Sequence, residues 1–326
     1  MAADEPGEFE RIARFFAPLA GPGGLGLRDD AALVDWHAGR ELVVTADAIV
    51  AGVHYLPDDP PDLVARKLLR VNLSDLAAMG ARPLYYVLTT ALPPELGPGW
   101  LAGFAAGLGE DQRHFGVDLL GGDSVSTVGP AVLSLTAIGE VAAGKAVRRS
   151  GAKPGDLLWV SGTIGDANLG LRLLRGAYSE LAAEHRSYLI RRFQIPQPRT
   201  ELGPRLSGLA HAMIDISDGL VADLGHICET SRVAAVVELD LLPLSPAALV
   251  VAEGDPAIRA RLAAGGDDYE LLFTAPANAE KPLADLSCRL GIPITNIGRI
   301  EPGAGVRIAD ADGRVITLDH TGYRHF

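Results

Sequence analysis

Apolar and polar positions alternate with two different periods along the first half of the chain. Phe9, Ile12 and Phe16 follow the spacing of one helix face, which predicts an opening amphipathic helix that ends near Pro18. Helical spacing predicts further helices at 62–80 and 100–115. Apolar runs predict strands at 41–45, 84–92, 117–123 and 131–141.

The second half shows the same alternation of short apolar runs and helical segments. Strands are predicted at 157–160, 212–217 and 233–239, and helices at 168–175 and 218–229. A polar stretch rich in Gly and Pro, 148–156, predicts a boundary between domains 1–147 and 148–326. We therefore expect an α/β (α+β) fold in two domains, each a mixed sheet covered by helices.

The composition is that of a folded protein without a nucleic-acid surface. The chain has 326 residues, 48% of them hydrophobic and 21% charged, which excludes wholesale disorder and allows two cores. Acidic residues outnumber basic ones by 41 to 29, and aromatic residues make up only 6%. Neither a basic surface that follows phosphates nor a platform for base stacking is predicted.

Three features bear on location. No apolar run reaches the roughly 18 residues of a membrane helix, and the opening MAADEPGEFERIARFF lacks the pattern of a signal peptide. Cys228 and Cys288 show no metal-like spacing and lie in apolar-periodic segments, so we expect two buried free thiols, as in a reducing compartment. The sequence thus predicts a cytoplasmic protein without a membrane segment.

Two glycine-rich stretches resemble nucleotide-binding patterns and fail on their context. Gly21–Gly26 reads GPGGLG, but a predicted helix precedes it where the dinucleotide motif needs a strand, so we expect a flexible loop. Gly139–Lys145 nearly matches the P-loop, but Ala146 stands where a hydroxyl would bind Mg²⁺. If the chain binds ATP, it uses another device.

Aspartates beside small residues carry the chemical signal. Small neighbours let the backbone approach a ligand, and adjacent apolar runs predict that the acids stand where a core strand ends and the chain turns. The set consists of Asp29, Asp30, Asp47, Asp75, Asp123, Asp215 and Asp218. Each one alone is more simply a turn former or a helix cap, an interpretation that weakens for the whole set.

Several carboxylates in one partly buried site raise one another's pKa unless a cation compensates them. Mg²⁺ takes oxygen ligands and usually bridges one or two carboxylates to substrate phosphates. An acidic cleft alone repels ATP, so metal ions supply the attraction in such a site. Arg149, Lys153 and Lys67 are the basic residues nearest the motifs that could add fixed phosphate donors.

Other candidates are weaker. His54 follows a predicted strand and is more often a structural residue at such a place, while Asp267 and Asp268 precede a strand and fit a turn. The spacing supports no Ser-His-Asp or Cys-His arrangement. We therefore expect a direct transfer, without a covalent enzyme intermediate and without an assigned catalytic side chain.

In their order along the chain, these motifs resemble the thiamine-monophosphate kinase family, which shares a superfamily with aminoimidazole ribonucleotide synthetase and selenophosphate synthetase. The resemblance covers almost the whole chain and rests on DDAALV, TADAIVAGVHYLP, VNLSDLAAMGARP, LLGGDS, RSGAKPGD, SGTIGD, IDISDGLVADLGHI, GGDDYEL and TLDHTGYRHF. It implies an aminoimidazole-ribonucleotide-synthetase-like fold, a homodimer formed by the N-terminal domain, and a site between the domains. The implied activity is ATP-dependent phosphorylation of thiamine monophosphate to thiamine diphosphate.

The resemblance also implies which residues bind. Several Mg²⁺ ions would be held by Asp30, Thr45, Asp47, Asp75, Asp123, Asp215 and Asp218. ATP would contact Gly122, Asp123, Arg149 and Ser217. Thiamine monophosphate would contact His54, Asp267 and His320.

Three positions depart from the family pattern. Arg28 replaces a usual Gly beside the first acids, Ala46 replaces a usual Thr, and His320 stands where an aromatic residue is common. Two alternatives stay open: a non-catalytic relative that binds the nucleotide or thiamine phosphate, and a superfamily enzyme with another acceptor. A selenophosphate synthetase would show a reactive Cys in a Gly-rich N-terminal loop, and a hydrogenase-maturation relative would end in Cys rather than Phe326.

Overall fold

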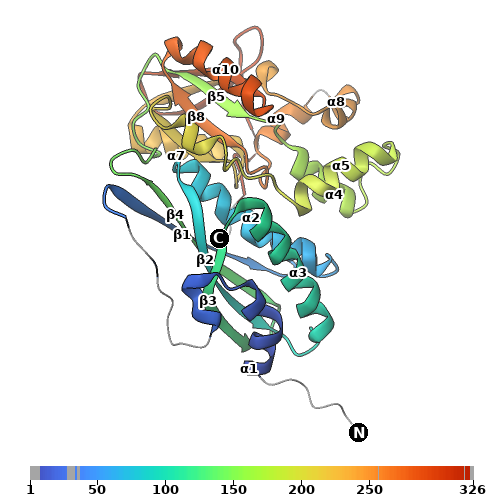
Figure 1. The fold of residues 1–326 in the computed structure, drawn as a ribbon. Coiled ribbons are helices and arrows are strands. Elements are labelled where there is room, and N and C mark those ends of the chain that lie inside the picture. Colours follow the sequence, from blue (N-terminus) through green and yellow to red (C-terminus); the bar gives the residue numbers. More distant parts are fainter. Residues whose placement is uncertain (1–7, 28–33, 35–36, 256, 319, 324–326) are drawn as a thin grey trace. The chain divides into compact units, whose positions relative to one another are not determined.

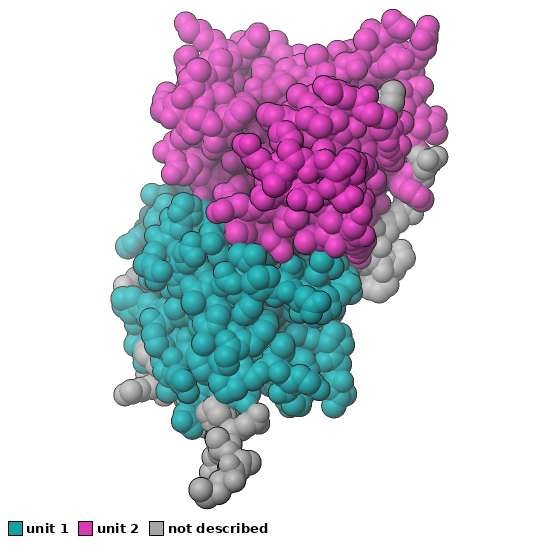
Figure 2. Space-filling model, turned by 90° about the vertical axis from the view of Figure 1, so that its right-hand side faces the viewer, with its two compact units in different colours: residues 1–76, 82–144 teal, residues 77–81, 145–326 magenta. Residues whose placement is uncertain are grey.

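The computed structural model of the protein describes residues 8–27, 34, 37–255, 257–318 and 320–323. The chain forms two compact units (Figure 2): residues 1–76 with 82–144, and residues 77–81 with 145–326. Both units combine helices and mixed sheets, which confirms the expected fold class. None of the described helices is long and apolar enough to cross a membrane.

The first unit contains a four-stranded sheet with the order β1-β4-β2-β3 (Figure 1). Its strands are β1 (Arg40–Val50), β2 (Arg82–Leu92), β3 (Asp118–Ser126) and β4 (Val132–Ala142), and its long helices are α2 (Pro61–Ala78) and α3 (Pro98–Phe115). Thr45 of β1 bonds to α2, and the Tyr86 hydroxyl of β2 donates to Gln112 Oε1 of α3 at 2.8 Å. Because Thr45 and Tyr86 both pair with Ala137, the two helices cover the same face of the sheet.

The N-terminal segment runs beside strand β3. It is helical from Glu8 to Leu19, as predicted: α1 (Glu8–Arg11), a π-helix (Ile12–Phe16) and a 3₁₀ helix (Ala17–Leu19). The prediction of a flexible loop at 21–26 is wrong, because Pro22–Leu27 forms another 3₁₀ helix. Gly21 donates to the Leu119 carbonyl at 3.0 Å, and a Cβ there would lie 2.4 Å from Asp118 Cβ. The glycine allows the backbone to lie directly against the strand.

The second unit contains a seven-stranded sheet with the order β11-β10-β7-β9-β5-β8-β6. Its strands are β5 (Leu157–Ser161), β6 (Ala212–Asp215), β7 (Ala234–Glu238), β8 (Leu271–Ala275), β9 (Ile294–Glu301), β10 (Gly305–Ala309) and β11 (Val315–Ile316). Its helices are α4 (Asp166–Leu174), α5 (Ala183–Gln194), α6 (Gly203–Leu206), α7 (Leu220–Ser231), α8 (Pro246–Glu253), α9 (Ile258–Ala263) and α10 (Glu280–Leu290), with 3₁₀ turns at Leu239–Leu241 and Ala277–Ala279.

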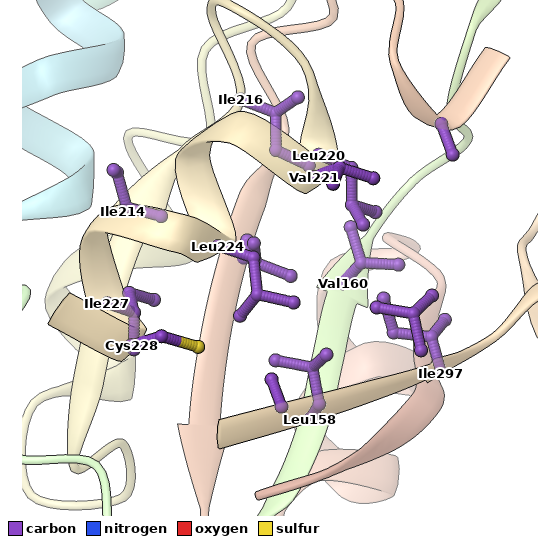
Figure 3. Close-up of a cluster of buried hydrophobic side chains, with 14 of the residues drawn as sticks. Leu158, Val160, Ile214, Ile216, Leu220, Val221, Leu224, Ile227, Cys228 and Ile297 are labelled. Carbon is purple, nitrogen blue, oxygen red and sulfur yellow. The ribbon is translucent and has the colours of Figure 1, made fainter. Parts of the chain in front are cut away.

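Alternating side chains of this sheet enter two different cores. Val160 of β5 packs with Leu220 and Leu224 of α7 on one face (Figure 3). The next residue back, Trp159, belongs to the core on the other face, together with Leu283 of α10. The sheet is therefore buried on both sides, and polar loops can gather only at its ends.

One end of the sheet collects three loops. Strand β8 is antiparallel to both β5 and β6, and it pairs Leu272 with Val160 and Leu271 with Asp215. The ends of β5 and β6 therefore lie beside the start of β8. This topology brings together the segments 162–165, 216–219 and 264–270.

Candidate functional site

Three predicted metal ligands of the first unit lie together between β1 and α2. The Thr45 hydroxyl donates to Asp75 Oδ2 at 2.5 Å, and the Asp47 N–H donates to Asn72 Oδ1 at 3.0 Å. Asn72 is fully buried, and its amide nitrogen donates to the Leu68 carbonyl at 2.9 Å. The helix thus fixes the backbone of β1 where Asp47 projects.

The donor set of this cluster fits Mg²⁺. Asp47 is exposed, Asp75 is half-buried, and every ligand on offer is a carboxylate or hydroxyl oxygen. Among the residues that the structure describes, no group of three or more His, Cys, Asp or Glu side chains could hold a metal by itself. A cation here would be shared with phosphate oxygens, which is the usual environment of Mg²⁺.

The expectation that all the acids stand at strand ends is wrong. Asp47 lies inside β1, Asp123 inside β3 and Asp75 inside α2, whereas Asp215 is the last residue of β6. Strands β1 and β3 are the two edges of their sheet and continue beyond the predicted runs. An edge strand tolerates an exposed carboxylate in its interior, because one of its sides faces solvent.

Asp123 lies across the sheet from Asp47. The register links Asp47 through Leu135 and Leu88 to Gly122, so three strand spacings, about 14 Å, separate the two acidic segments. Asp123 is exposed and its Oδ1 accepts the Ser124 N–H at 2.8 Å. The structure therefore does not bring Asp123 into the Asp47–Asp75 cluster.

Gly122 fits only as a glycine. A Cβ at this position would lie 1.7 Å from the Leu88 carbonyl oxygen on the neighbouring strand. Gly122 and Asp123 line a cavity of about 290 Å³, whose other walls include Phe16 and Leu120. The predicted nucleotide contacts of β3 thus border a largely apolar recess of the first unit.

His54 and Lys67 are tied to the backbone of the first unit. His54 Nδ1 accepts the Val50 N–H at 3.1 Å, so the neutral ring carries its proton on Nε2. Lys67 is 2% exposed, and its ammonium donates to the His54 carbonyl at 2.9 Å. The predicted metal ligand Asp30 and the unusual Arg28 lie outside the described residues.

In the second unit, Asp215, Ser217 and Asp218 follow one another at the end of β6. Asp215 is 3% exposed, and Ser217 and Asp218 are half-buried. The N–H groups of residues 217, 218 and 219 all donate to Oδ2 of the buried Asp223, each at 3.1 Å. Burial and then the charge of Asp218 raise the pKa of Asp223 to about 7, against the opposing effect of these three bonds.

Asp267 joins this loop through the backbone. Its N–H donates to the Ser217 carbonyl at 2.8 Å, and its φ of +72° turns the chain sharply before β8. Gly266 makes the close approach possible, since a Cβ there would lie 2.4 Å from the Ser217 carbonyl oxygen. The predicted thiamine-phosphate contact therefore lies beside the predicted nucleotide contact.

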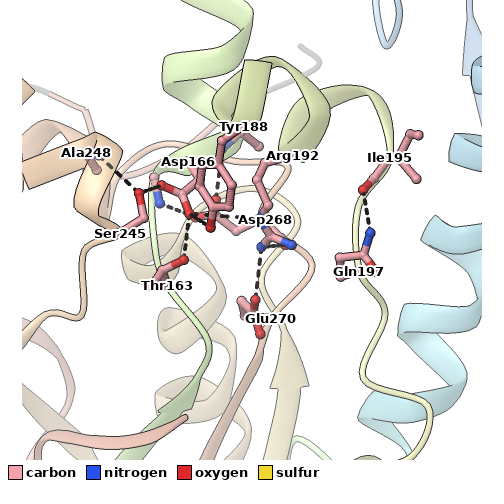
Figure 4. A network of polar contacts seen from close by, with 12 residues as sticks. Thr163, Asp166, Tyr188, Arg192, Ile195, Gln197, Ser245, Ala248, Asp268 and Glu270 are labelled. Carbon is pink, nitrogen blue, oxygen red and sulfur yellow. Dashed lines mark hydrogen bonds and ion pairs between the residues drawn. The ribbon is translucent and has the colours of Figure 1, made fainter. Parts of the chain in front are cut away.

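A buried polar network supports the Asp267 loop (Figure 4). Glu270 is fully buried and accepts bonds from Arg192 Nη2 at 3.0 Å, Arg199 Nε at 2.5 Å and the Ser161 hydroxyl at 2.6 Å. Asp268 accepts the Gly165 N–H at 2.7 Å, and burial raises its pKa well above the usual range. Of these two neighbouring aspartates, Asp267 is half-exposed, whereas Asp268 is buried and structural.

A second part of the network surrounds Asp166 at the start of α4. Asp166 is fully buried and accepts the hydroxyls of Thr163 and Ser245 at 2.6 Å and that of Tyr188 at 3.0 Å (Figure 4). Burial, and then the charge of Asp166, raise the pKa of Tyr188. These contacts hold the loop after β5 against α5 and α8.

The two remaining predicted contacts of the second unit, Arg149 and His320, differ in their distance from this loop. The Arg149 carbonyl accepts the Ser231 hydroxyl at 3.2 Å, at the end of α7 that is about 18 Å from Ser217. His320 is exposed, and three residues later the Tyr323 N–H donates to the Asp218 carbonyl at 3.0 Å. The C-terminal segment thus comes close to the Ser217–Asp218 loop, whereas the Arg149 backbone does not.

The sequence interpretation missed Asn72 and Asp223. Asn72 lies three residues before Asp75 on α2, within the motif NLSD, where its spacing places it on the same helix face. Asp223 is an acid on a helix whose neighbours Leu220 and Leu224 are core residues. A charged residue on an apolar helix face is the signal that could have found it.

Models of two domain families match the chain. They are the AIR synthase related protein, N-terminal domain, over residues 28–141, and the AIR synthase related protein, C-terminal domain, over residues 153–311. The curated thiamine-monophosphate kinase of Caulobacter vibrioides is 42% identical over 99% of this chain and 92% of its own. That of Escherichia coli K12 is 42% identical over 98% of both chains.

The chain belongs to the thiamine-monophosphate kinase family. The resemblance stated from the motifs is thereby confirmed. Solved structures of thiamine-monophosphate kinases include that of Stenotrophomonas maltophilia K279a, with a TM-score of 0.82 and 44% identity over 89% of this chain and 91% of that one. The structure of AaThiL complexed with AMPPCP and TMP has a TM-score of 0.79 and 31% identity over 100% of this chain and 99% of that one.

A hydrogenase maturation protein, HypE of Escherichia coli, has the same fold. Its TM-score is 0.77 at 23% identity, over 95% of this chain and 96% of that one. At this identity the likeness concerns the fold alone. The thiamine-monophosphate kinase family accounts for both the sequence and the fold.

Proposed function

We propose that this protein is a thiamine-monophosphate kinase, which transfers the γ-phosphoryl group of ATP to thiamine monophosphate and yields thiamine diphosphate. The observation that carries the proposal is the cluster of Thr45, Asp47 and Asp75, fixed by Asn72, in a chain 42% identical to a curated kinase over 98% of its length. The AaThiL complex, which contains AMPPCP and TMP, supports the same pair of substrates. ATP is a co-substrate in this reaction.

The reaction needs positioning more than acid–base chemistry. The attacking phosphate oxygen of thiamine monophosphate is already ionised near neutral pH, so the chain needs no strong general base and no covalent intermediate. Mg²⁺, when bound, neutralises the charge of the phosphates. The chain would contribute carboxylates on β1 and α2 of the first unit and on the loop after β6 of the second unit, which hold the cation that orients the anionic substrates for an in-line transfer.

The proposed roles of the site residues follow the family pattern. Mg²⁺ ions would be held by Asp30, Thr45, Asp47, Asp75, Asp123, Asp215 and Asp218, of which Asp30 is proposed from the sequence alone. ATP would contact Gly122, Asp123, Arg149 and Ser217, and thiamine monophosphate would contact His54, Asp267 and His320. The contact between the Asp267 N–H and the Ser217 carbonyl supports neighbouring places for the two substrates.

A homodimer is part of the proposal. The face of the first sheet opposite α2 and α3 carries apolar side chains, with Leu42, Val44 and Val125 exposed to 46%, 60% and 48%. A sheet with an apolar face is normally covered on that side. A second copy of the same sheet supports a closed, two-fold assembly. A cytoplasmic location is proposed with it, supported by two cysteines that form no disulfide.

The decisive experiment is direct product analysis. The purified protein is incubated with ATP, MgCl₂ and thiamine monophosphate, and thiamine diphosphate is measured by chromatography. We expect product only when all three are present, and none after Mg²⁺ is removed with a chelator. Binding of both substrates without product would support the alternative, a non-catalytic relative, and would refute the proposed activity.

A further inference from the structure

One buried carboxylate holds the loop between β6 and α7. The N–H groups of Ser217, Asp218 and Gly219 converge on Oδ2 of Asp223, each at 3.1 Å. Asp223 is 3% exposed, and its own N–H donates to the Gly219 carbonyl at 3.0 Å. Three consecutive donors on one oxygen restrain this loop more than the one or two bonds of an ordinary helix cap.

The carbonyl groups of the same loop are also hydrogen-bonded within the protein. The Ser217 carbonyl accepts the Asp267 N–H at 2.8 Å, and the Asp218 carbonyl accepts the Tyr323 N–H at 3.0 Å. The backbone of residues 217–219 is therefore engaged on both its donor and its acceptor sides. The side-chain polar groups of this loop are the Ser217 hydroxyl and the Asp218 carboxylate, and both residues are half-buried.

A loop of this shape ordinarily attracts anions. Successive N–H groups at the start of a helix form a concave donor site that suits phosphate. The helix that follows this loop, α7, is 12 residues long. Here the Asp223 carboxylate fills that donor site from inside the protein. The loop consequently offers a ligand no free backbone donor pocket but a half-buried carboxylate, that of Asp218, which favours a cation over a bare phosphate.

We propose that Asp223 is a positioning residue of the phosphoryl-transfer site, which closes the backbone anion site before α7 and holds Ser217 and Asp218 in place for a metal–nucleotide complex. The identity of the ligand rests on the proposed function. The arrangement of the loop rests on the hydrogen bonds alone.

Binding of Mn²⁺ and the ATP analogue AMPPCP, measured by calorimetry and by Mn²⁺ paramagnetic resonance without thiamine monophosphate, tests this role. D223A removes the acceptor, and we expect about 10- to 100-fold weaker binding, the usual effect of losing a group that orients metal ligands. D223N keeps an oxygen that accepts N–H bonds and should stay within about threefold of the wild type. If D223A does not fold, D223S serves the same purpose. Its hydroxyl is polar but shorter than the carboxylate, so it cannot accept all three N–H groups.

Asp310 offers a matched control in the same unit. Its Oδ1 also accepts two loop N–H groups, from Asp312 at 3.0 Å and Arg314 at 2.8 Å, in the turn between β10 and β11. D310A removes a comparable set of bonds outside the site. Its affinity for Mn²⁺ and AMPPCP should match the wild type even if its melting temperature falls.

A double-mutant cycle separates positioning from a general loss of stability. If Asp223 acts through Asp218, adding D223A to D218N weakens binding little beyond D218N alone, because the two changes remove one interaction. Independent effects would instead multiply. The proposal is overturned if D223A binds like the wild type, if D223N loses as much affinity as D223A, or if the two substitutions act independently.

The outcome is distinguishable from a failure of the proposed function. The binding experiment contains no acceptor substrate, whereas the activity is judged by thiamine diphosphate formation. If the wild type binds Mn²⁺ and AMPPCP but makes no product, the proposed function is refuted, and the role of Asp223 can still be tested by binding. If the wild type is active and D223A binds as tightly as the wild type, only the proposed role of Asp223 is refuted.

Discussion

The described aspartates differ widely in environment, from the exposed ligand candidate Asp47 to fully buried structural residues. Asp47 is exposed on β1, whereas Asp166 and Asp268 are at most 1% exposed and accept hydrogen bonds from neighbouring loops. Sequence neighbours do not separate the two classes, since Asp267 and Asp268 are adjacent and differ in exposure. The hydrogen-bond partners within the fold distinguish Asp166 and Asp268 as structural, whereas Asp215, which is also buried, remains a ligand candidate at the end of β6.

Asp47 is the clearest test of the ligand class. D47N removes one negative charge and should lower the turnover of thiamine monophosphate by about 100-fold or more, because electrostatic stabilisation of the transferring group is lost. Its free energy of unfolding should change by no more than about 0.5 kcal/mol, since the side chain is exposed. Steady-state kinetics and urea denaturation measure the two quantities.

The control for Asp47 is Glu41, another exposed acid on the same strand. E41Q makes the same change of charge six residues earlier and should leave turnover unchanged. Equal losses in both variants would point to the overall charge of the strand and would contradict a specific role for Asp47.

Glu270 tests the structural class. It is fully buried between Arg192 and Arg199, so E270Q keeps the shape of the side chain and removes the negative charge that both guanidinium groups contact, with Asp166 at 3.9 Å remaining beside Arg192. Removing one partner of a buried ion pair costs about 3–5 kcal/mol. Denaturant unfolding should show a loss of that order.

The matched control for Glu270 is an exposed pair, Asp312 with Arg314, whose side chains are 69% and 77% exposed. D312N should change the free energy of unfolding by less than about 1 kcal/mol. A similarly small change in E270Q would show that the network is dispensable for the fold.

At the scale of elements, the strands with regular apolar patterns were predictable, whereas the full length of the edge strand β1 was not. Strands β2 and β4 match the runs at 84–92 and 131–141 within two residues. Strand β1 extends well beyond 41–45, because its exposed positions break the alternation on which the prediction depends. Whether a strand lies at an edge depends on the order of strands in the sheet, and the sequence of the strand alone does not reveal it.

The candidate site was predictable in its residue types and not in its partners. The acids in NLSD and IDISDG were found from their small neighbours, yet Asn72 reaches Asp47 from 25 residues away. Such a contact depends on the packing of α2 against β1, which no local pattern encodes. The same holds for Asp123, whose distance from Asp47 follows only from the strand order.

The two cysteines report on the packing of two helices. Cys228 on α7 is buried, as predicted, and burial raises the pKa of its thiol to about 11. The prediction that Cys288 is buried is wrong, because it lies on the exposed face of α10. A raised thiol pKa leaves about one thousandth of Cys228 as the reactive thiolate at pH 8, and that fraction grows about tenfold per pH unit up to pH 11. We expect a disulfide reagent to label the exposed thiol of Cys288 rapidly in the native protein and that of Cys228 only slowly.

The variant C288S isolates the buried thiol. It should react only slowly in the native state and fully after denaturation, so its rate measures the opening of α7 from the core shown in Figure 3. Rapid labelling of native C288S at pH 8 would contradict the packing of this helix.

At the scale of the whole molecule, the apolar face of the first sheet bears on the proposed dimer. Both long helices lie on the other face, and Leu42 and Val44 project from an edge strand with about half of their surfaces exposed. An exposed apolar edge is an aggregation hazard unless a partner covers it. A self-complementary dimer satisfies this requirement with a single surface.

Replacing Val44 with a charged residue tests this assembly. Sedimentation or light scattering should give the wild type twice the chain mass of 34.2 kDa. V44E places a carboxylate on each side of the two-fold interface and should yield monomers, because two desolvated like charges would have to be buried together. V315E is the matched control, since Val315 is 64% exposed on strand β11 of the other unit, and it should remain dimeric. A monomeric wild type at micromolar concentration would refute the dimer, and its exposed apolar face would then need another partner to account for its solubility.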